Sequence, residues 1–188
     1  MSMHKRWFAC VIGVCLFSGS AGAQSMVDHF GLGQTATANE AAKYFSIPPS
    51  GAGLPAGSGT AKAGVLVFAN TCAACHGDKL QGNPAAGIGG DRLLGGRGSL
   101  VGKTPVKTVE SYWPYATTLF DYIKRTMPFS APGSLRDDEV YSLVAYILSE
   151  ARIIKPSETM DAKSLPKVQM PNKDGFIPDA RPELQLYR

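Results

Sequence analysis

The stretch Cys72-Ala73-Ala74-Cys75-His76 decides how the rest of this 188-residue sequence is interpreted. Two thiols three residues apart lie on the same side of one helical turn, and a histidine follows at once. This spacing places the thiols beside the two vinyl groups of one porphyrin edge and an imidazole beneath its iron. The pattern is typical of covalent haem c. It makes Cys72 and Cys75 the thioether residues and His76 the first iron ligand.

Two other uses of paired cysteines fit the sequence less well. A thioredoxin-like site lies in a βαβ pattern, and no such pattern surrounds residues 72–76. A zinc site needs two further Cys or His ligands. Cys10 and Cys15 lie in the expected signal peptide described next, and His29 is the one other histidine that follows it. We therefore expect one covalent haem c per chain.

The first 23 residues have the order of a secretory signal peptide. Lys5 and Arg6 precede an apolar run over 7–17, and residues 21–23 form a small-x-small cleavage site. The run is far shorter than the roughly 20 residues that span a bilayer. We expect cleavage before Gln24, no membrane span in the mature chain and a periplasmic location. Cleavage lowers the net charge from +4 to +2, which gives no support to nucleic-acid binding.

Helical periodicity is concentrated in three segments after residue 60. Thr60 can cap a helix over 61 to about 72, where Gly64 is costly unless another backbone approaches closely. A second helix is expected over about 115–126. The strongest pattern spans 137–150, where apolar residues repeat at helical spacing on one face. No segment alternates as a strand, so the sequence predicts an all-α fold with much irregular chain.

The remaining segments are rich in glycine, proline and polar residues. We expect 24–59 to form an N-terminal arm with one short helix at 38–45. Residues 60–154 should form the haem domain, and 155–188 a C-terminal tail packed on that domain. The segment 77–102 contains nine glycines and is expected to be a long loop wrapped around the haem.

The second axial ligand of the iron has several candidates. Met127 lies between two expected helices, where Pro128 ends the first helix and can hold the methionine in a fixed loop. Met170 also precedes a proline and is the main alternative, while Met160 and the other candidates lie in the arm and tail. We favour Met127. Ligation by histidine and methionine fills both axial positions, which favours electron transfer over chemistry at the iron.

Four further side chains are candidates for contacts with the haem propionates. Trp113 and Tyr115 either hydrogen-bond the propionates or pack as core aromatics, and the sequence does not separate the two. Arg92 and Arg97, in the glycine-rich loop, could pair with propionates, but solvated surface arginines are the favoured interpretation.

Longer segments of the sequence carry a family resemblance. Gly64 and Phe68 before the haem motif, and Met127 with its proline before the last helix, resemble class I cytochrome c. The segments SYWPYATTLFDYI at 111–123 and LPKVQMPN at 165–172 are more specific. They are similar to the first haem domain of the cytochrome subunit of the periplasmic molybdenum sulfur (sulfane or sulfite) dehydrogenase of sulfur oxidation.

The resemblance implies a class I cytochrome c fold and a role in single-electron transfer. The donor would be a molybdenum dehydrogenase subunit that acts on sulfite or sulfane sulfur, and the acceptor a downstream cytochrome or oxidase. The best-known members carry two haem domains, whereas this sequence has one Cys-x-x-Cys-His motif. The chain would be an electron-transfer protein or a non-catalytic subunit. A general periplasmic electron carrier for another dehydrogenase, and an enzyme with catalysis at the haem, are the alternatives.

Overall fold

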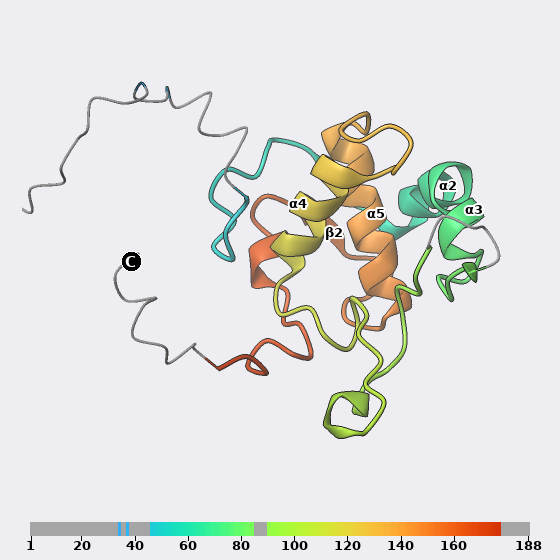
Figure 1. The fold of residues 1–188 in the computed structure, drawn as a ribbon. Coiled ribbons are helices and arrows are strands. Elements are labelled where there is room, and N and C mark those ends of the chain that lie inside the picture. Colours follow the sequence, from blue (N-terminus) through green and yellow to red (C-terminus); the bar gives the residue numbers. More distant parts are fainter. Residues whose placement is uncertain (1–33, 35–36, 38–45, 85–89, 178–188) are drawn as a thin grey trace, which may run out of the picture. The chain divides into compact units, whose positions relative to one another are not determined.

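The computed structural model describes residues 34, 37, 46–84 and 90–177 (Figure 1). The chain divides into two units, 1–35 and 36–188, and the helices and strands described below belong to the second unit. The expected signal peptide and the expected helix at 38–45 lie outside the described residues. Within those residues, no helix is long and apolar enough to cross a bilayer.

The described fold is helical, with one small sheet. The α-helices are α2 (Ala61–Thr71), α3 (Ala73–His76), α4 (Ala116–Thr126) and α5 (Asp137–Glu150). The strands are β1 (Ser58–Thr60) and β2 (Thr159–Asp161), and two short 3-10 helices are η2 (Ser99–Val101) and η3 (Leu165–Lys167). Apart from the small sheet, this is the helical fold with much irregular chain that the sequence predicts.

Helices α2 and α5 begin where their local sequence signals place them. Thr60 caps α2, because its hydroxyl oxygen accepts a hydrogen bond of 3.3 Å from the N–H of Ala63. The first turn of α5 is acidic, which suits the positive end of the helix dipole. Its Glu139 carboxylate accepts a hydrogen bond of 2.8 Å from the N–H of Arg136. Helix α5 has Arg136 in place of a Ser or Thr cap, and this bond gives the backbone N–H at its start a partner.

The small sheet corrects the expectation that no strand is present. β1 and β2 pair antiparallel, with Gly59 opposite Met160. Each strand has three residues, which is too short for a two-residue alternation to be recognised. The two strands are also far apart in the sequence, so no hairpin signal links them. Their pairing joins the segment before α2 to the tail.

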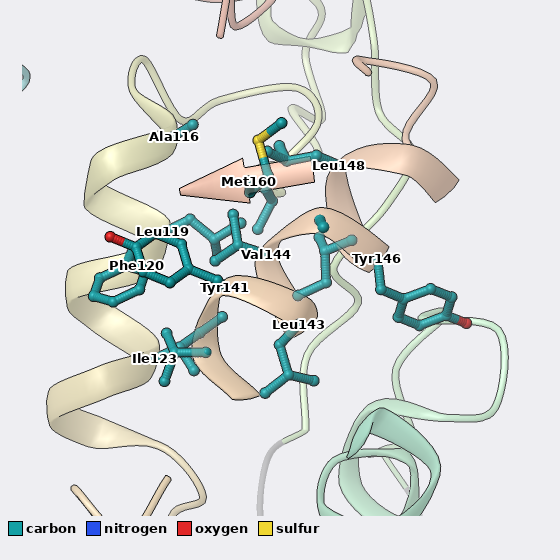
Figure 2. Close-up of a cluster of buried hydrophobic side chains, with 14 of the residues drawn as sticks. Ala116, Leu119, Phe120, Ile123, Tyr141, Leu143, Val144, Tyr146, Leu148 and Met160 are labelled. Carbon is teal, nitrogen blue, oxygen red and sulfur yellow. The ribbon is translucent and has the colours of Figure 1, made fainter. Parts of the chain in front are cut away.

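Helix α5 is central to the hydrophobic core and packs against both α2 and α4 (Figure 1). Between α4 and α5, the rings of Phe120 and Tyr141 lie 4.5 Å apart between centroids, and both side chains are fully buried. Figure 2 shows Met160 of β2 closing this cluster from the tail side. Fully burying one such large apolar side chain contributes about 1.5–3 kcal/mol.

The crossing of α2 and α5 brings two backbones into contact. Gly64 is buried, and a Cβ added to it would overlap the carbonyl oxygen of Ser142 and lie 2.6 Å from the Cβ of Tyr146. A Cβ added to Gly59 would overlap the backbone nitrogen of Ser142. This confirms the close approach predicted from a glycine inside a helix. Because the obstructing atoms are backbone, no side chain can rotate away.

The described part of the arm is hydrogen-bonded to α4 and α5. The N–H of Ile47 donates to the Asp121 carboxylate at 3.1 Å, and the Tyr141 hydroxyl donates to the carbonyl of Pro55 at 2.9 Å. Burial raises the pKa of Tyr141 to about 12. The hydroxyl therefore keeps its donated proton throughout the neutral range.

Residues 155–177 of the tail lie against the same helices. Met160, Leu165 and Met170 are buried in the core, and the side-chain amide of Asn172 donates to the carbonyl of Tyr112 at 2.7 Å. Three apolar anchors and a long-range hydrogen bond fix this segment along its length.

Replacing Gly64 by alanine should destabilise the protein, because the new Cβ forces α2 and α5 apart. Overpacking of a tight contact costs roughly 1–3 kcal/mol, which outweighs the gain of about 1 kcal/mol in helix propensity. Chemical unfolding of the haem-loaded protein, followed by helical circular dichroism, measures the loss. Gly102→Ala is the matched control, since Gly102 is exposed, has φ −86° and offers a Cβ 3.2 Å from its nearest atom. Equal stability of Gly64→Ala and wild type would contradict the close crossing.

Candidate haem site

The two cysteines lie at the junction of α2 and α3. The N–H of Cys72 donates to the carbonyl of Phe68 at 2.8 Å, and its own carbonyl accepts from the N–H groups of Cys75 and His76 at 3.1 and 2.9 Å. Both cysteines are free thiols and half-buried. The structure therefore brings two thiols and an imidazole together on a single turn.

The thiol of Cys72 is held by its neighbour. The hydroxyl of Thr71 donates its one proton to the carbonyl of Val67 at 2.6 Å and lies 3.3 Å from the Cys72 sulfur. Because that proton is already used, the thiol is the donor in the Thr71–Cys72 contact. Burial raises the pKa of the Cys72 thiol above its ordinary value. The sulfur is therefore positioned by its neighbour and forms no disulfide.

The imidazole of His76 is oriented by a backbone carbonyl. Its Nδ1 lies 2.7 Å from the carbonyl oxygen of Asp91. A carbonyl can only accept, so Nδ1 carries the proton and Nε2 carries the free lone pair. A hydrogen bond to the ring nitrogen that does not bind the metal fixes the tautomer and orientation of metal-binding histidines. His76 is therefore prepared to bind a metal through Nε2.

The glycine-rich loop lies directly on the backbone of the motif. A Cβ added to Gly90 would overlap the carbonyl oxygen of Cys75 and lie 3.0 Å from its Cα. Asn83 ties this loop to the motif. Its N–H donates to the carbonyl of Gly90 at 2.9 Å, and its side-chain amide donates to the carbonyl of Ala74 at 3.0 Å. This packing brings the following residue, Asp91, within reach of His76.

The donor set fits covalent haem c. Two free thiols on one turn can form two thioethers, and an adjacent imidazole with its Nε2 available can bind the iron. Among the described residues, no group of three or more His, Cys, Asp or Glu side chains could hold a metal ion by itself. Cys72, Cys75 and His76 are the residues that would hold the haem on this side.

Trp113 and Tyr115 lie immediately before α4, and Tyr115 is its N-cap residue. The indole ring of Trp113 meets the ring of Tyr122 edge-on, with centroids 5.6 Å apart and an interplanar angle of 85°. Both candidate side chains are half-buried. Cys72 and Trp113 are partly buried against the same hydrophobic core, which links the motif to the entrance of α4.

The three methionines in the described residues have different surroundings. Met127 follows the last residue of α4, and its N–H donates to the carbonyl of Ile123 at 3.0 Å. Its side chain is only partly buried and lies at the edge of the core. Met160 and Met170 are 2% and 3% exposed and fill the core. Met26 and His29 lie outside the described residues.

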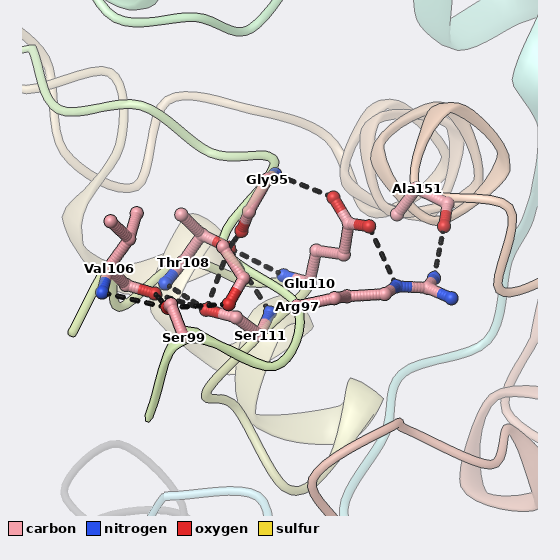
Figure 3. Close-up of polar contacts among 9 residues, drawn as sticks. Gly95, Arg97, Ser99, Val106, Thr108, Glu110, Ser111 and Ala151 are labelled. Atoms are coloured by element: carbon pink, nitrogen blue, oxygen red, sulfur yellow. Dashed lines mark hydrogen bonds and ion pairs between the residues drawn. The ribbon is translucent and has the colours of Figure 1, made fainter. Parts of the chain in front are cut away.

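A polar network ties the glycine-rich loop to α5 (Figure 3). One oxygen of the Glu110 carboxylate accepts from the N–H of Gly95 at 2.6 Å, and the other pairs with the guanidinium of Arg97 at 2.7 Å. Arg97 also donates to the carbonyl of Ala151, which ends α5. Arg97 is exposed, as expected, but its guanidinium is not free in solvent, because it bridges two elements. Arg92 is exposed, as expected.

Three hydroxyl groups complete this network (Figure 3). The hydroxyl of Thr108 donates to the carbonyl of Gly95 at 2.7 Å, and that of Ser111 donates to the carbonyl of Val106 at 2.6 Å. Ser99 in η2 accepts from the N–H of Val106 at 3.0 Å. Thr108 and Ser111 are buried, so these bonds form away from water and fix the loop on the chain that leads into α4.

The comparisons with known proteins agree with this geometry. The cytochrome c family profile matches residues 61–151. A chain of the crystal structure of the sulfane dehydrogenase SoxCD from Paracoccus pantotrophus is 36% identical, with a TM-score of 0.71. The match covers 85% of this chain and 78% of that one. The chain belongs to the cytochrome c family. No curated protein sequence matches it.

Membership of the cytochrome c family gives the site its chemistry. A cytochrome c domain binds haem c covalently and carries electrons, and the free Cys72 and Cys75 beside His76 supply the groups that this attachment needs. The partner of His76 could not be found from the sequence, because it is a backbone carbonyl whose position depends on the fold of the loop. The ion pair of Glu110 with Arg97 could not be predicted either, because the sequence shows only two opposite charges thirteen residues apart.

Haem should remain attached to the denatured protein, because two thioether bonds survive unfolding. Electrophoresis under denaturing conditions with haem staining should show a coloured band, and the pyridine haemochrome assay should give one haem per chain. Cys72→Ala with Cys75→Ala should abolish the band, whereas Met127→Leu should retain it. A double cysteine variant that kept the stain would contradict the assignment.

Proposed function

We propose that this protein is a periplasmic monohaem cytochrome c that carries single electrons from a molybdenum-dependent sulfite or sulfane dehydrogenase to a downstream cytochrome or oxidase. The observation that carries the proposal is the similarity to a chain of a sulfane dehydrogenase over 85% of this sequence. The specific segments at 111–123 and 165–172 support it, and the basic and apolar start of the chain supports export to the periplasm.

We propose His76 and Met127 as the two axial ligands. His76 presents Nε2, and its orientation is fixed by the carbonyl of Asp91. For the second ligand, burial favours Met127 over Met170, since the thioether of Met170 is enclosed by the protein core and that of Met127 is partly exposed. To reach a haem, a core methionine would have to leave the hydrophobic core. The cavity left behind would cost roughly 2–5 kcal/mol, as in large-to-small core substitutions.

Trp113 and Tyr115 are proposed as hydrogen-bond donors to the haem propionates. The indole N–H and the phenolic hydroxyl are both donors, and neither has a hydrogen-bond partner within the described residues. Half-buried donors of this kind normally find a partner. A propionate carboxylate of the haem would accept hydrogen bonds from both. The two donors lie at the start of α4, and Met127 lies at its end.

The residues suit outer-sphere electron transfer. Haem, when bound, supplies a one-electron couple at the iron. His76 and Met127 together leave no open axial position for a substrate, so chemistry on a small molecule is disfavoured. A molybdenum centre that oxidises its substrate by two electrons requires an acceptor that docks and unloads twice for each turnover. The protein would therefore act as the electron-transfer partner or subunit, with substrate chemistry at the dehydrogenase.

Met127→Leu should abolish the weak near-infrared band of sulfur-to-iron charge transfer in the oxidised protein, because it removes the thioether and keeps the volume. Met170→Leu is the matched control and should retain the band. The measurement is an absorption spectrum of each haem-loaded variant at neutral pH. Loss of the band in Met170→Leu and its survival in Met127→Leu would assign the ligand to the tail.

The oxidised cytochrome should be reduced rapidly by a purified molybdenum sulfite or sulfane dehydrogenase from the same organism once substrate is added. Haem absorbance in a stopped-flow instrument measures the rate, with an unrelated cytochrome c of similar potential as the control. Omission of substrate should leave both proteins oxidised. A rate no faster than that of the control would overturn the dehydrogenase partner and leave a general periplasmic carrier.

A further inference from the structure

The loop that follows Met127 is held mainly at its ends. The chain leaves α4 at Met127 in an extended conformation, with φ −120° and ψ 148°, and enters α5 at Asp137. Residues 129–134 are all exposed. Among the described residues, their backbone hydrogen bonds close turns inside the loop, such as the one from the N–H of Ala131 to the carbonyl of Pro128 at 2.9 Å. Leu135 is the buried apolar anchor at the far end.

Lys124 joins the two ends of this loop. It lies in the last turn of α4, and its ammonium donates to the carbonyl of Leu135 at 2.8 Å. The same ammonium pairs with the Asp137 carboxylate at 2.7 Å, across to the first turn of α5. The paired oxygen of Asp137 is shielded from solvent. One side chain therefore fixes where the loop leaves α4 and where it reaches α5.

The position of this contact along α4 links it to the candidate ligand. Lys124 precedes Met127 by three residues, so both belong to the final turn of the helix and its exit. The N–H of Met127 is bonded to Ile123, which fixes its backbone, while the rest of the loop depends on the contacts of Lys124. If those contacts are lost, the ammonium no longer restrains the chain after Met127, and the loop can move away from the core.

We propose that Lys124 is a positioning residue for the Met127 ligand: by bridging Leu135 and Asp137 it keeps the loop closed and the methionine sulfur in place. The inference rests on the proposal that Met127 is the second axial ligand. A purely structural role for the ion pair would stabilise α4 and α5 without affecting access to the iron. The two roles differ in one measurable quantity, the ease with which an external ligand displaces methionine in the folded protein.

Imidazole is the probe, because it binds to ferric haem only where the methionine has left. Titration of the oxidised, haem-loaded protein with imidazole, followed by the Soret band at a temperature far below unfolding, gives an apparent affinity. Lys124→Met should raise this affinity about 3- to 10-fold, the range expected from charge-assisted bonds to a side chain one-third exposed. Lys163→Met, at an exposed lysine of the tail, is the matched control and should leave it unchanged.

Asp137→Asn tests the ion pair with a nearly isosteric change, so it remains informative if Lys124→Met folds poorly. It should raise imidazole affinity by less than Lys124→Met does, because the bond to the carbonyl of Leu135 remains. In the double variant the two effects should not add, since both act on one contact. Affinities equal to that of Lys163→Met in both single variants would overturn the positioning role.

The outcomes for the ligand and for its positioning residue are separable. If Met127→Leu keeps the charge-transfer band, the proposed ligand is wrong and the inference on Lys124 falls with it. If Met127→Leu loses the band and both Lys124→Met and Asp137→Asn bind imidazole as the control does, the ligand stands and the positioning role alone is wrong.

Discussion

The contact between the backbones of α2 and α5 at Gly64 and Ser142 sets the geometry on which the haem domain depends. Helix α2 ends at the cysteine motif, and α5 forms the centre of the hydrophobic core. Because backbone meets backbone there, the distance between the two helices cannot relax through a change of side-chain rotamer. The turn that carries the cysteines is therefore placed relative to the core by a rigid contact about two helical turns earlier in α2.

The two ends of α5 hold the two loops that would lie on either side of a haem. At its first turn, Asp137 pairs with Lys124 and so closes the loop after Met127. At its last turn, the carbonyl of Ala151 accepts from Arg97, which anchors the glycine-rich loop whose earlier part carries Asp91. One well-packed helix thus holds both loops at its ends: the Asp137 carboxylate suits the positive end of its dipole, and Arg97 satisfies a carbonyl at its negative end.

Local signals in the sequence were enough for the three long helices and for the turn that carries Cys72, Cys75 and His76. The Thr60 cap, the stripe along 137–150 and the Cys72–His76 motif are each encoded within a few residues, and Gly64 correctly indicated a close crossing. Long-range features were not accessible. The pairing of β1 with β2, the carbonyl of Asp91 against His76 and the bridge from Arg97 to Ala151 each depend on where distant backbone atoms come to lie. Met127 and Met170 both precede proline, and the difference in their burial is not visible in the sequence.

The pairing of β1 with β2 has a consequence for the order of assembly. Ser58 faces Asp161 across the ladder, so the chain that enters α2 is completed by a strand about one hundred residues later. Closing so long a loop carries a large entropic penalty before any contact rewards it, and such non-local pairings slow folding. A growing chain that already contains the cysteine motif still lacks this strand and the Met160 side chain that it inserts into the core. The Cys72–His76 turn is therefore complete in the sequence long before the residues that close the domain, and 159–161 are among the last to join the core.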